Sequence, residues 1–322
     1  MKTVLISNHD FFVFLGSFIT GLLMAPLVLS LLTSLKSNQT ISTYAPEGHQ
    51  VKAGTPTMGG IIIVLAFLVV GLFDQVSWRE LALVFGFGLI GFVDDFLVPR
   101  LFNKRGLEWK QKIVLQLLIA TVCLFSGHFN IYLLGAIVTV LFMSNAFNFS
   151  DGLDGLASSL AFWMFCGLFI ISNVAFFGIP MLGHKMQHGS QGVLIDLNLI
   201  LLGSLIPFAY LNVPKAKVFM GDVGSLPIGA LFGFELVNIV RLVPQYSVAL
   251  IVLSIPMILE LVPVPLQIFS VKVFKRKLFP FTPIHHAFEK AGWPETSVTA
   301  LFAVVQLFCV VVSIWISINV RS

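Results

Sequence analysis

Aspartates gather in three short motifs of a chain in which only 11% of the residues are charged. They are Asp94 and Asp95 in GFVDDF (91–96), Asp151 and Asp154 in NAFNFSDGLDGLA (145–157), and Asp222 in VFMGDVGS (218–225). Five carboxylates close together would repel one another unless a cation lay among them. Oxygen ligands with room for water suit Mg²⁺, so the pattern predicts a magnesium site. An aspartate can also simply cap a helix, which is an equally good interpretation of Asp151 or Asp154 alone but not of all five together.

Glycines flank the polar residues of these motifs and of a fourth motif, VKAGTPTMGG (51–60). Glycine permits unusual backbone angles and close approach of a ligand, and N–H groups at a turn that enters a helix bind anions. Acidic residues for Mg²⁺ beside such loops indicate phosphate chemistry. Lys52 lies inside the glycine- and threonine-rich motif, so we expect it to contact the substrate.

Two adjacent histidines, His285 and His286, lie in a fifth motif, PIHHAFEKAGW (283–293). We expect them to contact a substrate phosphate or to transfer a proton. Glu260, in the preceding apolar segment, is a further candidate for lining a polar groove, whereas Glu235 is interpreted as structural. The remaining histidines are also interpreted as structural: His9, His49, His128, His184 and His188.

Membrane-spanning helices must position these motifs. The 322 residues are 57% hydrophobic with a mean hydropathy of +0.96, which is far more apolar than a soluble domain. Apolar runs recur from end to end, which predicts an all-α, polytopic membrane protein. We expect ten spans, at about 11–35, 57–73, 81–98, 113–127, 131–149, 156–177, 195–212, 224–241, 247–273 and 298–319. The polar gaps between them are too short to fold alone, so we expect a single membrane-embedded domain over 1–322.

The distribution of lysine and arginine predicts which membrane side faces the cytoplasm. Fourteen of the 19 fall in the loops that follow odd-numbered spans, and cytoplasmic loops are enriched in these residues. Both termini are therefore expected outside, and the five motifs lie in or beside the five cytoplasmic loops. Their convergence on one face predicts an active-site cleft open to the cytoplasm. Apart from Lys52, we interpret most of these basic residues as this orientation signal alone.

In order and spacing, the five motifs closely resemble those of the phospho-N-acetylmuramoyl-pentapeptide transferases, a branch of the polyprenyl-phosphate N-acetylhexosamine-1-phosphate transferases. The resemblance covers nearly the whole chain, from KAGTPTMGG to PIHHAFEKAGW. It implies that undecaprenyl phosphate attacks the β-phosphate of UDP-N-acetylmuramoyl-pentapeptide, releasing UMP and forming lipid I with Mg²⁺ as cofactor. Direct attack and a covalent aspartyl intermediate both stay open. It further implies a location in the bacterial cytoplasmic (inner) membrane among its lipids, often a homodimer, and no nucleic-acid partner.

The resemblance also implies roles for individual residues. Asp222 would be the principal Mg²⁺ ligand with Asp151 as a second, and Asp94 would be the base for the lipid phosphate, supported by Asp95. The residues implied to line the nucleotide–sugar pocket are Asn148, Asp151 and Asp154, with Phe219 stacked on uracil and Lys52, Thr57, Asn212 and His286 as further contacts. His285 is placed among the catalytic residues.

The chain departs from the pattern of that family in three places. Ala287 replaces the third of three consecutive histidines, Val98 replaces a lysine that follows the DD pair, and NFSDGLDG stands for NLTDGLDG. None of these changes removes a carboxylate, so we expect an active enzyme.

Two other functions are compatible with parts of the pattern. A related enzyme that loads N-acetylglucosamine-1-phosphate would share the aspartates but should differ in the motif that carries His285 and His286. A secondary transporter would place ionisable groups near the bilayer midplane and show an inverted repeat. We find no such repeat, and the acidic residues gather toward one face.

Overall fold

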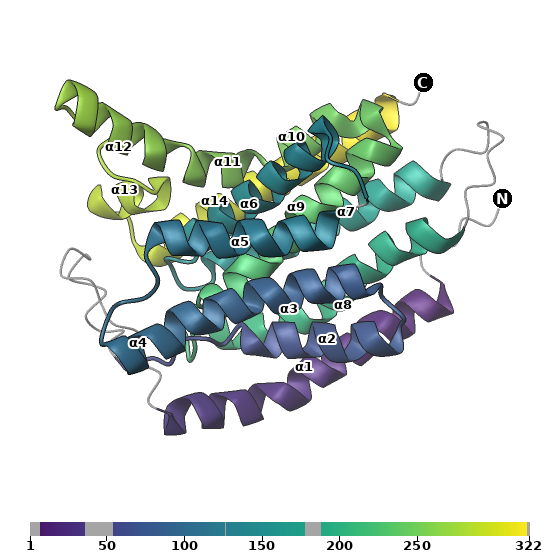
Figure 1. Ribbon diagram of the computed structural model, residues 1–322, viewed down its shortest axis with the longest axis horizontal. Helices are drawn as coiled ribbons and strands as arrows, with labels where there is room; N and C mark the ends of the chain where they lie inside the picture. Colours follow the sequence, from purple (N-terminus) through teal and green to yellow (C-terminus); the bar gives the residue numbers. More distant parts are fainter. Residues whose placement is uncertain (1–6, 36–53, 126, 178–187, 321–322) are drawn as a thin grey trace.

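The computed structural model describes residues 7–35, 54–125, 127–177 and 188–320, and these are helical with no β-strand. Figure 1 shows the helices lying side by side as a bundle, with the start of α1 (Asn8–Ser34) and the end of α14 (Glu295–Asn319) at the same end. Most side chains that point outward from this bundle are apolar, as in Leu22, Leu27, Phe308 and Trp315. An apolar outer surface of this kind is suited to contact with lipid rather than with water.

The remaining elements follow in chain order. They are α2 (Ile61–Phe73), α3 (Trp78–Phe92), the π-helix η2 (Val93–Leu97), α4 (Val98–Phe102), α5 (Trp109–Leu124), α6 (Ile131–Ser150), α7 (Leu156–Phe177), α8 (His188–Asn212), α9 (Asp222–Leu242), the 3-10 helix η4 (Pro244–Tyr246), α10 (Ser247–Leu253), α11 (Ile255–Leu261), α12 (Pro263–Phe274) and α13 (Ile284–Lys290).

Each of the ten predicted spans falls on helical structure, which confirms the all-α, polytopic class. Eight helical stretches of the described residues are long and apolar enough to cross a membrane, and α2 and the stretch Pro244–Leu253 are apolar but shorter. The helix α5 has 16 residues and belongs neither to the long apolar helices nor to the shorter apolar ones. The number of spans therefore stays a prediction.

Two predicted boundaries differ from the structure for local reasons. The span expected at 113–127 begins earlier, because Glu108 and Gln111 form a capping box that starts α5 at Trp109. The span expected at 247–273 is divided into α10, α11 and α12, because Pro256 and Pro263 each fall within the first two residues of a new helical segment. Figure 1 shows α12 projecting away from the bundle.

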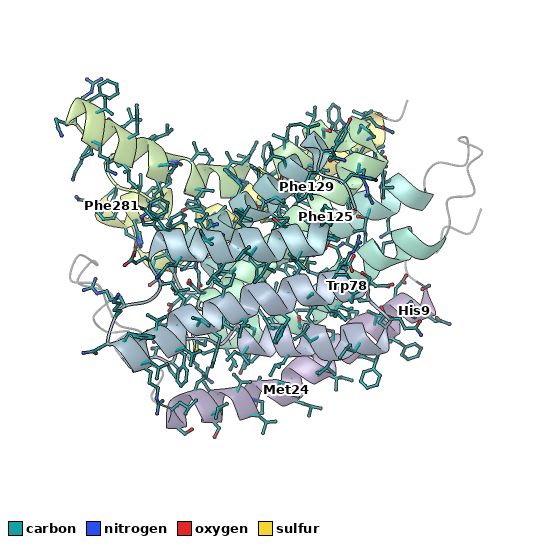
Figure 2. The ribbon with its side chains drawn as sticks, viewed as in Figure 1. His9, Met24, Trp78, Phe125, Phe129 and Phe281 are labelled. Carbon is teal, nitrogen blue, oxygen red and sulfur yellow. The ribbon has the colours of Figure 1, made fainter. Side chains whose placement is uncertain are left out.

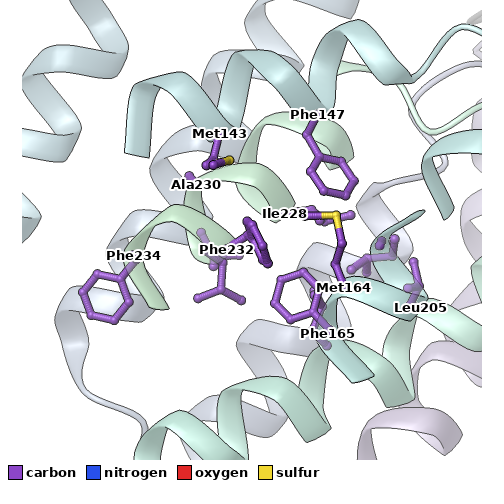
Figure 3. Close-up of a cluster of buried hydrophobic side chains, with 14 of the residues drawn as sticks. Met143, Phe147, Met164, Phe165, Leu205, Ile228, Ala230, Phe232 and Phe234 are labelled. Atoms are coloured by element: carbon purple, nitrogen blue, oxygen red, sulfur yellow. The ribbon is translucent and has the colours of Figure 1, made fainter. Parts of the chain in front are cut away.

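The helix α9 forms the centre of the bundle. All its residues from Val223 to Leu236 are buried, and it packs against α2, α3, α6 and α7. Figure 3 shows Ile228 and Phe232 of α9 among Phe147, Met164 and Phe165, with the Phe165 and Phe232 rings edge-to-face at 5.8 Å. These side chains are fully or almost fully buried, so the core fixes the position of the first turn of α9.

Glycines let α3 and the residue before α2 approach this first turn closely, and let α6 pack tightly along α9. A Cβ added at Gly91 of α3 would collide with the backbone of Asp222 and Val223, and one added at Gly60 would collide with Gly224. Farther along, a Cβ at Gly233 would lie 2.8 Å from the Cα of Val140 on α6. Small residues at helix contacts allow such close backbone packing in membrane proteins. As a result, the ends of α3 and α6 and the residue before α2 all meet the N-terminus of α9.

Candidate active site

The paired aspartates of the GFVDDF motif lie on a π-helical turn. The π-helix η2 continues α3 without a break, and single π turns inside α-helices often occur at functional sites. Its Asp94 accepts a hydrogen bond at Oδ1 from the backbone N–H of Leu107 (2.7 Å). Asp95 accepts at Oδ2 from the N–H of Val223 in the first turn of α9 (3.3 Å). The turn therefore directs both carboxylates toward the start of α9.

Asp222, the first residue of α9, completes a group of three carboxylates that we call the carboxylate cluster (Asp94, Asp95 and Asp222). One oxygen from each lies within 4.8 Å of the others. The close contact of Gly91 with the Asp222 backbone explains this proximity, because it brings the two helix ends together. Asp94 and Asp222 are 128 positions apart in sequence. The fold nevertheless brings together these three carboxylates, all of which are predicted as catalytic.

A lysine lies among these carboxylates. The ammonium of Lys112, from the first turn of α5, donates to Asp94 Oδ2 (3.0 Å) and contacts Asp222 Oδ2. All three side chains are largely buried, with 13–17% exposed. From the sequence, Lys112 is predicted only to mark the cytoplasmic side of the membrane. The Glu108 and Gln111 pair could have indicated its position, because a capping box there starts the helix before Lys112 and so keeps this lysine out of a solvated loop.

Asn148, in the last turn of α6, adds a fifth polar group to the three carboxylates and Lys112. Its Nδ2 donates to Asp222 Oδ1 (2.5 Å) and to Ser225 Oγ (3.1 Å). The amide therefore fixes the Asp222 carboxylate from the side opposite Lys112, with each partner on a different oxygen. The structure brings the predicted residue Asn148 into direct contact with the predicted metal ligand.

The TPTMGG motif and the FMGD motif are paired along their backbones. Phe219 donates its N–H to Pro56 O (2.9 Å), and Gly59 donates to Phe219 O (2.8 Å). Gly221 then turns the chain into α9 at φ +70°, where a Cβ would lie 2.6 Å from Asp95 Oδ2 and 2.9 Å from Thr57 Oγ1. Glycine is required here by both the backbone angle and the contact with Asp95. Thr57 and the half-buried Phe219 thus adjoin the carboxylate cluster, whereas the predicted contact Lys52 lies outside the described residues.

The DGLDG loop (151–155) joins α6 to α7 beside this site. Asp151 accepts at Oδ2 from the N–H of Gly221 (2.9 Å) and is not a member of the carboxylate cluster. Asp154 is buried and accepts at Oδ2 from the N–H groups of Lys215 (3.0 Å) and Ala216 (3.1 Å). The loop is thus connected to the FMGD motif itself and to the chain just before it.

The buried amide of Asn212 supports the same loop. Its Oδ1 accepts from the N–H of Gly155 (3.2 Å) and from the hydroxyl of Ser158 (3.0 Å), and its Nδ2 donates to Val218 O (3.1 Å). Asn212 is 1% exposed. Its polar atoms therefore bind protein groups, although the sequence analysis expected it to contact the nucleotide sugar.

The two predicted histidines flank the loop. His285 is fully buried, and its Nδ1 lies 2.7 Å from Glu260 Oε2, so the carboxylate orients the ring. Its Nε2 is directed at the DGLDG loop, because a Cβ added at Gly152 would lie 2.5 Å from it. The ring of His286 lies against that of His285 at a tilt of 57°, with centroids 4.1 Å apart, and His286 pairs with Glu289. Glu260, a candidate from the sequence, thus positions His285 rather than lining an open groove.

A surface cavity of about 500 Å³ lies beside these motifs. The residues that line it are Leu29, Thr33, Gly54, Thr55, Pro56, Ala216 and Lys217. No aspartate is among them, so the cavity adjoins the TPTMGG motif without opening over the carboxylate cluster. The predicted cleft above the cluster stays a prediction.

The chemistry of the carboxylate cluster and Lys112 suits a bound cation. Three carboxylates and one ammonium leave a formal charge of −2, which a divalent cation would neutralise. The donors are hard oxygen atoms from separate chain segments, which is the ligand class that Mg²⁺ takes, usually with waters retained. A positive charge within this set can also bind a phosphate. The arrangement thus suits chemistry on a phosphate bound through a metal.

Comparison with known proteins places these motifs in one family. Residues 77–240 match the family described as glycosyl transferase family 4, and residues 52–64 match phospho-N-acetylmuramoyl-pentapeptide-transferase signature 1. Proteins named phospho-N-acetylmuramoyl-pentapeptide-transferase are similar over nearly their full length. The one from Staphylococcus carnosus is 31% identical over 94% of this chain and 98% of its own, and that from Bacillus subtilis is 31% identical over 95% and 97%. The one from Thermotoga petrophila is 33% identical over 91% and 94%.

Proposed function

The chain belongs to the phospho-N-acetylmuramoyl-pentapeptide-transferase family, and we propose that it makes lipid I in peptidoglycan synthesis. In this reaction an oxygen of undecaprenyl phosphate forms a bond to the β-phosphorus of UDP-N-acetylmuramoyl-pentapeptide. The bond from that phosphorus to the bridging oxygen breaks, and UMP leaves with the electron pair. The observation that carries the proposal is the carboxylate cluster with Lys112 at the N-terminus of α9.

Asp94, Asp95 and Asp222 would together hold Mg²⁺, with Asp222 as the principal ligand. When bound, the ion would neutralise charge on the diphosphate and on the leaving phosphate. The sequence analysis also named Asp151 as a ligand, but its contact with the Gly221 N–H favours a role in holding the FMGD turn. Fixing Gly221 fixes the direction of the Asp222 side chain, because the two residues are adjacent.

Lys112 and Asp94 are the chain's own groups for the attacking phosphate. Most of a phosphate monoester is already dianionic at neutral pH, since its second pKa is about 6. Asp94, as the proposed base, would therefore be needed only for the minor fraction of lipid phosphate that is still monoanionic, from which it would accept the remaining proton. The Lys112 ammonium can attract the anionic phosphate and hold Asp94 in place through the hydrogen bond between them.

The nucleotide sugar would lie toward the DGLDG loop. Asn148 and Asp151 border the carboxylate cluster on this side, and Thr57 and Phe219 adjoin it. His286 lies near the DGLDG loop at Gly152. Lys52 is proposed as a further contact. We propose that Asp154 and Asn212 act on the substrate through the loop that they hold, because their polar atoms bind backbone groups. His285, oriented by Glu260, would support the loop at Gly152.

The proposed setting is the bacterial cytoplasmic (inner) membrane, with the site facing the cytoplasm and both termini outside. The concentration of lysine and arginine in the odd-span loops supports this orientation. A donor made in the cytoplasm and a lipid acceptor in the bilayer would meet on that face. The single membrane-embedded domain over 1–322 and the homodimer implied by the resemblance stay predictions.

The test is release of UMP by the purified protein in detergent with undecaprenyl phosphate. We expect release with UDP-N-acetylmuramoyl-pentapeptide and Mg²⁺, and loss of release when a chelator removes the metal. Release with UDP-N-acetylglucosamine in place of the muramoyl donor would assign the chain to the related hexosamine branch. Release with neither donor would contradict the transferase assignment.

A further inference from the structure

A second group of ionisable side chains lies at the other end of the bundle from α4. It consists of His9 in the first turn of α1, Asp74 directly after α2, and Asp196 on α8, and we call it the His9 cluster. Figure 2 shows His9 at the end of the bundle away from Phe281, and Figure 1 shows α4 near that opposite end. The Nε2 atom of His9 lies 3.2 Å from Asp74 Oδ1 and 3.7 Å from Asp196 Oδ1.

The burial of the two carboxylates is not matched by hydrogen bonds. The side chain of Asp74 is 8% exposed and that of Asp196 is 14% exposed, whereas His9 is 61% exposed. Within the described residues, Asp74 Oδ2 is buried without a hydrogen-bond partner. A buried polar atom without a partner costs free energy, and a charged one costs more. A cation bound through both oxygens of the Asp74 carboxylate would remove this cost, since Oδ1 already faces His9.

Among the described residues whose charges act on Asp74, His9 and Asp10 oppose each other and Asp196 adds a second carboxylate. Burial raises the pKa of the Asp74 carboxyl, the nearby His9 opposes this effect, and the charge of Asp10 adds to it. Even a protonated His9 would balance only one of the two buried carboxylates. Asp10 itself caps the N-terminus of α1 through the N–H of Ser7 and contributes further negative potential.

We propose that His9, Asp74 and Asp196 bind one divalent transition-metal ion of the Zn²⁺ type. One atom from each residue lies within 4.8 Å of the others. Two ligands of a tetrahedral zinc ion stand about 3.3 Å apart, given metal–ligand distances of about 2.0–2.1 Å, and the two His9 separations lie near that value. An imidazole with two carboxylates favours zinc-like ions over Mg²⁺, which prefers oxygen ligands alone. The exposed imidazole leaves a side open for a water ligand.

A metal ion at the His9 cluster would link α1, the end of α2 and α8. The helices α1 and α8 already pack closely, since Ser17 donates its hydroxyl to Ile200 O (2.5 Å) and Gly203 touches the backbone of Phe14. The His9 cluster lies beyond this contact, near the start of α1, and adds the residue after α2. Binding of the ion to the folded state alone would therefore stabilise this end of the bundle.

The experiment measures zinc bound to the full chain, purified with a tag that contains no histidine. The protein is dialysed against Zn²⁺ in an excess of Mg²⁺, which occupies oxygen-only sites, and bound zinc is determined by mass spectrometry. We expect about one Zn²⁺ per chain, and an affinity at least about tenfold lower in His9→Gln and in Asp196→Asn. Asp10→Asn, a charge removal beside the cluster, should keep the zinc, and so should Asp222→Asn at the other end.

A second measurement separates metal binding from a simple ion pair. Chelator should lower the midpoint of thermal unfolding of the wild-type protein and leave that of His9→Gln unchanged. Because His9 is exposed, this variant should still elute as a folded protein. Equal zinc binding by wild type and His9→Gln would overturn the proposal and leave an ion pair. Loss of zinc in Asp222→Asn but not in His9→Gln would overturn it as well.

Discussion

The carboxylate cluster and the DGLDG loop contain the same residue type but give it different partners. In the cluster, Asp94 and Asp222 share the ammonium of Lys112. In the loop, Asp151 and Asp154 accept hydrogen bonds from backbone N–H groups of residues 215–221. A carboxylate bound by backbone amides holds the chain in place, whereas carboxylates gathered around one ammonium keep a net negative charge that a metal can use. Asp94 and Asp95 also accept backbone N–H bonds, so it is the gathering of three carboxylates around one ammonium that distinguishes the proposed metal ligands from the loop aspartates.

The largest effect is expected from Asp222→Asn in the carboxylate cluster. The amide removes a charge that faces Lys112 and the proposed metal, so we expect turnover to fall about 10³-fold, at the upper end of a single electrostatic contribution. The steady-state rate of UMP release measures this, with Asp10→Asn as the control for losing a carboxylate elsewhere. Activity within tenfold of the wild type would show that the cluster is not the reacting centre.

Lys112→Gln sharpens the comparison, because it removes the ammonium that distinguishes the cluster from the loop. We expect turnover to fall about 10²-fold, since a preorganised positive charge near the phosphate is lost. The Mg²⁺ concentration that gives half-maximal activity should fall, because the cluster gains one negative charge. Lys110→Gln, an exposed lysine on the same turn, should change neither quantity. A higher Mg²⁺ requirement in Lys112→Gln would instead make the lysine part of metal binding.

Asp154→Asn should affect stability more than chemistry. The amide can accept only weakly from the N–H groups of Lys215 and Ala216, so we expect a loss of about 1–3 kcal/mol in the free energy of unfolding. Thermal unfolding measures the loss, and turnover per folded molecule should fall less than about tenfold. A raised KM for the UDP donor with unchanged thermal stability would return Asp154 to the substrate pocket.

Gly152→Ala tests how the loop rests on His285. The added methyl would lie 2.5 Å from His285 Nε2, and Glu260 prevents the ring from turning away. We expect kcat/KM to fall about tenfold, less than the roughly 10²-fold cost of a 1 Å misplacement at a reacting group. Gly135→Ala is the matched control, because a Cβ at Gly135 meets no atom within 4 Å. An unchanged rate would show that the loop tolerates a shift of His285.

Much of the site could be predicted from the sequence, because the polar motifs are conspicuous in so apolar a chain. Asp94, Asp95, Asn148 and Asp222 were named from motifs and lie together in the structure. Lys112 was missed because a lysine near the end of a span normally marks only the cytoplasmic side. The His9 cluster was missed because its three residues come from separate segments with no motif around them.

The sequence alone determined that this is an all-α membrane protein, since long unbroken apolar runs favour helices, which satisfy their own backbone hydrogen bonds in lipid, over the alternating strands of a barrel. It also determined which residue types could bind metal and phosphate. Only the tertiary structure decided the partner of each carboxylate. Gly91 allows α3 to touch the start of α9, and the capping box at Glu108 starts α5 early enough to deliver Lys112. Whether an aspartate meets an ammonium or a backbone amide depends on contacts of about 3 Å, and helix packing sets these contacts between residues distant in sequence.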